Sequence, residues 1–372
     1  VTVATSWGPL AASVLHQELL SIARDLKTVD VDLQVYSVAA LQDLLARQLA
    51  TQGSATVDLA IVPNDWLGRL AQRGVLAELP ASRVAFLQSE LVGQALLAVT
   101  DRDRVLGYPL SADVLAFVYN PRLLTARPQS LEDVLEDDSL PPGVIPFACD
   151  LLSPYHVLPL LASTDGPTVD DTGAPIVRRA ELDALFSCLS PLWQRPGAWR
   201  PFRGDDLESL HVQLFAEGRL ASFLAGPWLL EALELTGQPF VVVPIPPAAP
   251  GAASAGALVG YQCAAIVQYS PWLDLTLEVG ARLVGAEVND RLNRTTRRLP
   301  VRADAYRSRE SVRAPGTLGF LSALEQGRFL PAGSSGQQRL QEISNVLSRL
   351  ALRPGPPNDC EVAEALAAEA LP

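Results

Sequence analysis

Polar and flat aromatic side chains recur at turns and strand ends of this sequence. The polar set, Asn64, Asp65, Asp113 and Gln262, offers carboxylate and amide groups that form hydrogen bonds with hydroxyls. A second set supplies rings that stack on the apolar faces of a cyclic molecule. These rings belong to Trp7, Trp66, Tyr155 and Trp228. Together the two sets predict a site for a sugar, which has many hydroxyls and one or two apolar faces.

Several of these residues also have other interpretations. Asn64 and Asp65 could cap a helix, and Trp228 could pack in a core. Asp65 and Asp113 could form a glycosidase pair, whose carboxyl groups stand about 5–10 Å apart. The sequence contains no GxSxG, Walker, HExxH or GxGxxG motif. We therefore expect a binding protein without catalytic residues, not an enzyme.

The charge balance argues against nucleic-acid binding. The 372 residues carry a formal net charge of -12 and a single lysine, Lys27. A phosphate backbone is bound by clustered Lys and Arg. The densest basic spot is Arg297 and Arg298, with Arg291 and Arg294 nearby. We interpret this spot as the solvated end of a helix and expect no nucleic-acid partner.

The cysteines do not indicate a metal site. Cys149, Cys188, Cys263 and Cys360 are far apart and show no CxxC or other metal-ligand spacing. We expect neither a metal ion nor a cofactor. In an oxidising compartment the four could form two disulfides, with three possible pairings, or they could be small buried apolar side chains.

Neither a targeting segment nor a membrane span is evident in the sequence. No apolar run approaches the about 20 residues needed to cross a bilayer. Val1 opens directly into strand-like sequence, and the chain contains no methionine. We interpret the sequence as a mature or trimmed chain without its targeting segment, which does not indicate a cytoplasmic protein.

Strands and helices alternate three times in residues 1–76. The apolar patterns predict strands at 1–5, 31–38 and 57–62 and helices at 11–27, 41–52 and 66–76. This alternation builds a parallel sheet with helices on its faces. Ligands of such sheets bind beyond the carboxyl ends of the strands. The turns Ser6–Pro9 and Pro63–Trp66 are expected to lie there.

Two long extended runs, 105–120 and 259–267, follow later in the chain. Asp113 lies within the first run among apolar neighbours, and Tyr261 and Gln262 lie within the second. A carboxylate buried without a partner costs several kcal/mol. Asp113 must therefore face water, a partner or a ligand.

A series of short motifs runs along almost the whole chain. The motifs are Val57–Leu76, Gly74–Glu78, Gly107–Pro121, Ser153–Tyr155, Leu158–Gly166, Ala225–Trp228, Pro244 and Gly260. In their order and spacing, the chain resembles the maltose-binding protein group of ABC-transporter solute-binding proteins.

The resemblance implies an α/β fold of the periplasmic-binding-protein-like type II. In that fold, two lobes are joined by a hinge of crossing strands, and the ligand occupies the cleft between the lobes. The first lobe would comprise residues 1–111 and 263–312, and the second 115–260 and 316–372. The hinge would lie near 112–114, 261–262 and 313–315.

The ligand-binding positions of the family transfer unevenly. Asp65, Asp113 and Tyr155 match positions that contact sugar hydroxyls or stack on rings, whereas Ser153 stands where the family has an acidic residue. Aromatic positions of the family are occupied here by Val62, Leu230 and Leu340. Stacking surface in their place could come from Trp7, Trp66 and Tyr261. The predicted ligand-binding set is Trp7, Asn64, Asp65, Trp66, Asp113, Ser153, Tyr155, Trp228, Tyr261 and Gln262.

The resemblance also implies a function. The protein would be extracytoplasmic, either periplasmic or anchored at the cell surface. It would capture a sugar or oligosaccharide, which could be maltose-like, by hinge closure. The protein would be a monomer and would deliver this ligand to an ABC-transporter permease. Two alternatives stay open, because the same fold could bind a non-sugar solute or serve a sensor. An anionic solute would be favoured by a pocket with more arginine than carboxylate.

Overall fold

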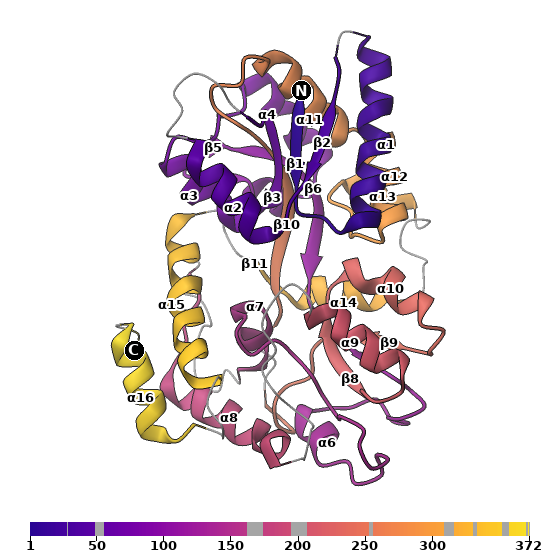
Figure 1. The fold of residues 1–372 in the computed structure, drawn as a ribbon, viewed down its shortest axis with the longest axis vertical. Coiled ribbons are helices and arrows are strands. Elements are labelled where there is room, and N and C mark those ends of the chain that lie inside the picture. Colours follow the sequence, from indigo (N-terminus) through magenta and orange to yellow (C-terminus); the bar gives the residue numbers. More distant parts are fainter. Residues whose placement is uncertain are drawn as a thin grey trace. The chain divides into compact units, whose positions relative to one another are not determined.

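The computed structural model forms two compact units, each with its own sheet (Figure 1). Unit 1 comprises Val1–Asp113, Gly260–Ala314 and Phe329–Gln337. Unit 2 comprises Val114–Val259, Pro315–Arg328 and Gln338–Pro372. The structure describes residues 1–27, 29–48, 56–161, 174–194, 207–252, 256–308, 316–329, 333–351, 357–369 and 371.

The chain passes from one unit to the other after Asp113 and after Val259. The sequence assigns all of 316–372 to the second lobe, whereas Phe329–Gln337 groups with unit 1. A hinge motion at these crossings stays a prediction. The third predicted crossing, 313–315, lies outside the described residues.

The larger sheet has the strand order β11-β10-β3-β1-β2, and β6 also pairs with β10. Its strands are β1 Thr2–Thr5, β2 Asp32–Val35, β3 Leu59–Pro63, β6 Gly107–Val114, β10 Leu258–Ile266 and β11 Arg328–Phe329. β1 pairs in parallel with both β2 and β3, which confirms the predicted parallel arrangement. β10 runs antiparallel to β3, with Gln262 opposite Pro63.

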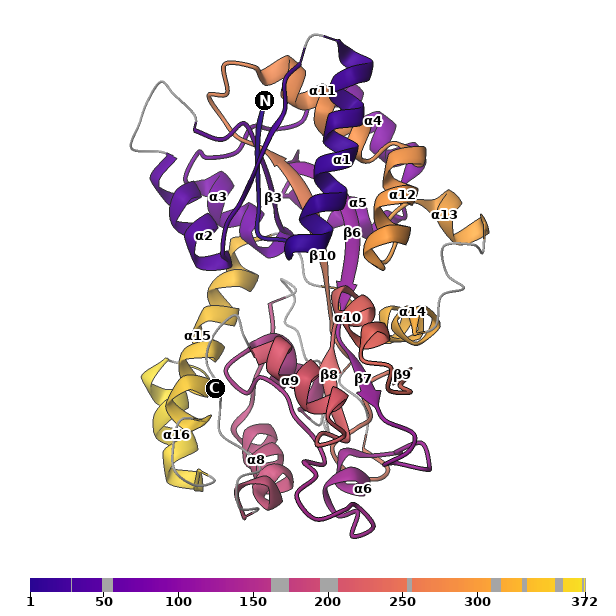
Figure 2. The same ribbon diagram turned by 45° about the vertical axis from the view of Figure 1, so that its right-hand side comes forward.

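Helices flank this sheet in unit 1. They are α1 Pro9–Leu26, α2 Val38–Arg47, η2 Asn64–Trp66, α3 Leu67–Gln72, α4 Ala81–Glu90, α5 Gly93–Leu97, α11 Leu273–Leu283, α12 Ala286–Thr296 and α13 Ala303–Ser308. α1 packs with α11 and α12 on one side of the sheet, and α2 and α3 lie on the other (Figures 1 and 2). The predicted first helix is confirmed, and Leu15, Leu19 and Ile22 are buried at helical spacing along it. The short strands β4 Thr100–Asp101 and β5 Arg104–Val105 form a separate pair.

Unit 2 has a sheet of three antiparallel strands in the order β8-β7-β9. These strands are β7 Ala116–Tyr119, β8 Ser222–Ala225 and β9 Val241–Val243. The helices with residues in unit 2 are α6 Leu131–Leu135, α7 Pro154–Val157, η3 Leu158–Leu160, α8 Arg179–Gln194, α9 Leu207–Ala216, η4 Pro227–Leu229, α10 Leu230–Leu235, α14 Thr317–Gln326, α15 Ser334–Ala351 and α16 Asp359–Ala368. The extended run 105–120 begins with the last residue of β5 and then contains two separate strands, β6 and β7, with breaks at Leu106 and Leu115.

Two histidines are buried in unit 2. His156 on α7 is 9% exposed and His211 on α9 is 5% exposed. The centre of the His211 ring lies 5.7 Å from the centre of the Phe223 ring. Burial lowers the pKa of His156 to about 3, aided by the nearby His211, and burial lowers the pKa of His211 to about 4.

These histidines predict a loss of stability in mild acid. In the unfolded chain they take up protons below about pH 6.5, whereas the folded chain keeps them neutral down to the lowered pKa values. The stabilisation is therefore complete above pH 6.5 and declines as the pH falls, by on the order of 2 kcal/mol per histidine between pH 7 and 5. Urea denaturation at pH 7 and at pH 5 measures this change in the free energy of unfolding.

The matched variants for this test are His156→Asn and His16→Asn. The asparagine side chain keeps an acceptor for the backbone N–H of Asp150, which His156 Nδ1 accepts at 3.4 Å, but it does not titrate. The stability of His156→Asn should fall less between pH 7 and 5 than that of the parent protein. The exposed His16 serves as the control, and its replacement should leave the pH dependence unchanged. Equal pH dependence in all three proteins would contradict the prediction.

Candidate functional site

A buried ion pair lies at the end of strand β6. The Asp113 carboxylate accepts hydrogen bonds from Arg298 Nη1, at 2.9 Å to Oδ1 and 3.1 Å to Oδ2. The side chain of Arg298 is 7% exposed and that of Asp113 is 13% exposed. The carboxylate expected to need a partner therefore has a cationic one, because an unpaired charge at this depth costs several kcal/mol.

Two further side chains complete this group, which we call the Asp113 cluster: Trp7, Asp113, Gln262 and Arg298. Gln262 Nε2 donates to Asp113 Oδ2 at 2.9 Å, and Gln262 Oε1 accepts from Trp7 Nε1 at 3.1 Å. The Arg298 guanidinium lies 4.4 Å from the centre of the Trp7 ring, which is cation–π distance. Each member of the cluster thus contacts two others.

The sheet explains why residues so distant in sequence meet. Trp7 follows the end of β1 by two residues, and η2 follows the end of β3 directly. β10 is antiparallel to β3, so Gln262 lies beside Pro63 at the same end of the sheet. β6 pairs with β10 and brings Asp113 to Gln262. The predicted meeting point beyond the carboxyl ends of β1 and β3 is therefore where this polar cluster forms.

Asp65 contributes a second carboxylate near this end of the sheet. It lies half-buried in η2, immediately after β3. Burial raises the pKa of the Cys263 thiol, and the charges of Asp113 and Asp65 raise it further. Both carboxylates therefore act electrostatically on one thiol.

Asn64, Trp66 and Tyr261 support this region from within. Asn64 is fully buried, and its Oδ1 accepts from the backbone N–H of Tyr261 at 2.9 Å, tying η2 to β10. Trp66 is 6% exposed. Tyr261 is 2% exposed and meets the Phe329 ring edge-on, and burial raises its pKa. Asn64 stands inside η2, whose cap position is occupied by Pro63.

The remaining predicted residues, Ser153, Tyr155 and Trp228, belong to unit 2. Ser153 precedes α7 as its cap residue, and Tyr155 is half-buried within that helix. Trp228 lies in η4, where its Nε1 donates to both carboxylate oxygens of Glu208 at 2.9 Å. The indole is therefore held by a polar contact and is not simply part of an apolar core.

A glycine shapes the position of the Trp228 ring. The ring folds back over Gly226, where an added Cβ would lie 2.1 Å from its Cη2 and Cζ3 atoms. No side chain larger than hydrogen fits there without moving the ring. Gly226 and Glu208 together define the orientation of this indole.

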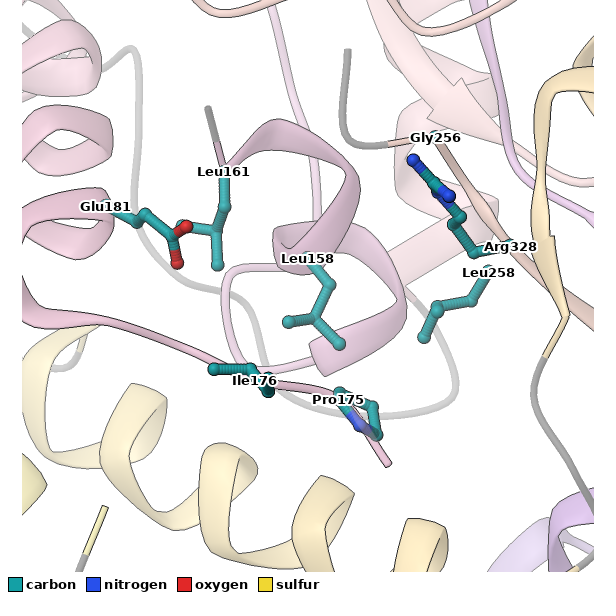
Figure 3. A pocket seen from close by; sticks show the side chains of 8 residues that line it. All are labelled: Leu158, Leu161, Pro175, Ile176, Glu181, Gly256, Leu258 and Arg328. Atoms are coloured by element: carbon teal, nitrogen blue, oxygen red, sulfur yellow. The ribbon is translucent and has the colours of Figure 1, made fainter. Parts of the chain in front are cut away.

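Unit 2 also contains a small apolar hollow, drawn in Figure 3. It has an empty volume of about 310 Å³, part of it open to solvent. Leu158, Ile176 and Leu258 line it together with Pro175 (Figure 3). The carboxylate at its margin, Glu181, is already paired with Arg178 at 2.8 Å. Arg328 is the other charged residue of the lining, and the remaining lining side chains are apolar. The hollow therefore offers few partners for hydroxyl groups and is a poor candidate for a sugar site.

Arg298 is the main residue that the sequence interpretation missed. The sequence placed it at the solvated end of a helix, but the residue is only 8% exposed, and that interpretation is wrong. The helix does end here, with Arg297 in the left-handed region at φ 57°, and the next residue turns inward. The available signal was Asp113 itself, because a lone carboxylate in an apolar strand must face water, a partner or a ligand, and a cation is one such partner.

The cysteines show no bridge among the three whose side chains are described. Cys149, Cys188 and Cys263 are free thiols, and Cys149 and Cys263 are buried. Among the described residues, no group of three or more His, Cys, Asp or Glu side chains could hold a metal ion. Within the same part of the chain, no helix has the length and apolar character required to cross a bilayer.

A family model described as bacterial extracellular solute-binding protein matches residues 25–317, which is more than half of the chain. The chain belongs to this family. The predicted membership among solute-binding proteins is thereby confirmed, and members of this family are binding proteins.

One sequence relative of this solute-binding protein is a maltotriose-binding protein of Pyrococcus abyssi. The two are 22% identical over 208 residues, which are 54% of this chain. The match covers 44% of the relative, less than half of its length.

Two solved structures share the fold of this solute-binding protein over nearly their full length. The maltotriose-binding protein of Thermus thermophilus, bound with maltotriose, has a TM-score of 0.78 and 22% identity, with 99% of this chain and 98% of that chain covered. The maltose-maltodextrin binding protein of Alicyclobacillus acidocaldarius has a TM-score of 0.81 and 16% identity, with 100% and 99% covered. These similarities confirm the predicted periplasmic-binding-protein-like α/β fold.

The close approach at Gly226 predicts the effect of a single methyl group. Gly226→Ala should displace the Trp228 ring and weaken its hydrogen bond to Glu208. We expect a loss of about 1–3 kcal/mol in unfolding free energy, as for other overpacked sites, with a changed tryptophan signal in near-ultraviolet circular dichroism. Gly93→Ala is the control, because a Cβ there meets nothing within 4 Å. An unchanged spectrum for Gly226→Ala would contradict the prediction.

Proposed function

We propose that this protein captures a neutral sugar or oligosaccharide and delivers it to the permease of an ABC transporter. The observation that carries the proposal is the Asp113 cluster at the carboxyl end of the unit 1 sheet, where Asp65 adds a second carboxylate. Carboxylate and amide oxygens in such an arrangement accept hydrogen bonds from hydroxyl groups. Relatives that bind maltotriose and maltodextrin support the same class of ligand.

The charges of the site favour a neutral ligand over an anion. The positive charge of Arg298 is matched by Asp113, with which it is paired. Asp65 adds a second carboxylate at the same end of the sheet. Among the described residues of the cluster, a ligand carboxylate or phosphate would meet a guanidinium that is already paired with a carboxylate, whereas a hydroxyl meets acceptors. A non-sugar organic anion is thereby disfavoured.

The proposed contacts come from both units. In unit 1, Asp65, Asp113 and Gln262 would accept from or donate to ligand hydroxyls, while Trp7, Asn64, Trp66 and Tyr261 shape their surroundings. In unit 2, the aromatic rings would stack on the sugar, and Ser153 would contribute a hydroxyl. The rings proposed for stacking are Tyr155 and Trp228. Membership in an extracellular family supports a periplasmic or cell-surface location.

A thermal-shift screen tests the proposed ligand class. Maltose, maltotriose and longer maltodextrins are compared with polyols, peptides and organic anions. A ligand that binds only the folded state, present at a hundred times its Kd, stabilises that state by about 2.7 kcal/mol. We expect the melting temperature to rise with a saccharide. Stabilisation by an anion alone would overturn the proposal, as would turnover of any glycan in the same panel.

The Asp65 carboxylate can be tested by substitution. Asp65→Ala removes an acceptor for ligand hydroxyls, and we expect the affinity for the best saccharide to fall at least tenfold, about 1.4 kcal/mol. Isothermal titration calorimetry measures the change. Asp43→Ala is the control, because Asp43 is exposed on α2 and pairs with Arg47 of the same helix at 3.3 Å. An unchanged affinity for Asp65→Ala would remove this residue from the site.

Hinge closure is the proposed conformational response to the ligand. A ligand bound by both units favours a closed form by its differential affinity for that form. Small-angle scattering should record a smaller radius of gyration at saturating saccharide. The Asp65→Ala protein at the same saccharide concentration provides the control and should show a smaller decrease. An unchanged radius with a tightly bound saccharide would contradict closure.

A further inference from the structure

The backbone that follows α12 places Arg298 next to Asp113. α12 ends at Thr296, and Arg297 takes the left-handed conformation that turns the chain toward the sheet. Leu299 then pairs with Ala112, whose N–H donates to the Leu299 carbonyl at 2.9 Å. Arg298 directly precedes Leu299, and Asp113 directly follows Ala112. The backbone hydrogen bond between Ala112 and Leu299 therefore brings Arg298 and Asp113 close together.

Two asparagines of α12 hold strand β6, which contains Ala112 and Asp113, to this helix. Asn289 Nδ2 and Asn293 Nδ2 both donate to the carbonyl of Leu110, at 2.8 Å and 3.1 Å. Both asparagines are buried. The segment that leads into Asp113 is thus fastened to the helix that leads into Arg298, and the geometry of the ion pair follows from the packing of these two elements.

The guanidinium of Arg298 contacts two members of the Asp113 cluster, Asp113 and Trp7. Among the described residues its hydrogen bonds go only to Asp113, and its buried Nε has no partner. Its Cζ atom lies over the Trp7 ring, 4.4 Å from the ring centre. A planar guanidinium can pair with a carboxylate and lie over an aromatic ring at once, and the compact ammonium of lysine is less suited to this combination.

The Trp7 side chain is held in the cluster by its contacts with Gln262 and Arg298. Its Nε1–H is used by Gln262, one face is covered by Arg298, and the residue is 4% exposed. Little of the ring is left to stack on a ligand. The indole instead excludes water from the ion pair, which strengthens the attraction between its charges.

We propose that Arg298 is a positioning residue for ligand binding, which orients the Asp113 carboxylate toward the ligand and holds Trp7 in place as its cover. The proposal rests on the proposed function, because it assumes that Asp113 accepts a hydrogen bond from the ligand. Arg298 acts through Asp113 and makes no contact with the ligand that is independent of it.

A double-mutant cycle tests this dependence. Saccharide affinity is measured by calorimetry for the parent protein, Arg298→Gln, Asp113→Asn and the double variant. We expect Arg298→Gln to weaken binding about tenfold in the parent and less than about twofold when Asp113→Asn is present, because coupled residues are not additive. Arg298→Lys, which keeps the charge, should restore part of the affinity. Additive effects, or an unchanged affinity for Arg298→Gln, would overturn the proposal.

The matched control is Arg294→Gln. Arg294 lies in the last turn of α12, four residues before Arg298, and forms a half-exposed ion pair with Asp290 at 2.8 Å, so this variant loses the same charge from a nearby position. Its affinity should equal that of the parent. A loss as large as that of Arg298→Gln would overturn the proposal by showing a general charge effect.

A second measurement needs no ligand. Arg298→Gln should change the near-ultraviolet circular dichroism of the unliganded protein, and the difference should vanish in a Trp7→Phe background. A difference that persists without Trp7, or no difference at all, would overturn the positioning role. If the parent protein binds no saccharide, the proposed function fails, and this spectral comparison still decides whether Arg298 positions Trp7.

Discussion

A carboxylate buried in an apolar strand costs several kcal/mol unless it is paired, and the structure of unit 1 depends on how Asp113 is paired. Asp113 lies 185 positions from Arg298 in the chain, yet the two side chains are in direct contact. Removing one member of such a buried pair costs about 3–5 kcal/mol, because the other is left as an uncompensated charge. The pair therefore constrains where α12 must end and how β6 must pass it.

The same pair gives the site its chemical character. Because Arg298 compensates Asp113, the cluster offers oriented acceptors without a strong net charge, and Gln262 extends it to the Trp7 indole. A site of this kind suits a ligand that brings many hydroxyls and no charge. The antiparallel pairing of β10 with β3 is equally necessary, since it carries Gln262 to the end of the sheet where β1 and β3 finish.

In unit 2, different residues orient an indole ring, that of Trp228. Trp228 is held by a carboxylate, Glu208, and by the absence of a side chain at Gly226. In both units an indole N–H is given a polar partner, which fixes the ring direction more narrowly than apolar packing does. Aromatic residues are thus oriented by hydrogen bonds in a protein whose family binds solutes.

The sequence by itself determined the local elements and the fold class. Periodicity of apolar residues predicted α1, the alternation of strands and helices predicted the parallel pairing of β1 with β2 and β3, and motif order predicted the family. It also showed that Asp113 must face water, a partner or a ligand. Only the tertiary structure decided which one, because an ion pair between residues so far apart leaves no periodic trace. The burial of His211 and the split of the run 105–120 into β6 and β7 were likewise set by packing, which local patterns do not encode.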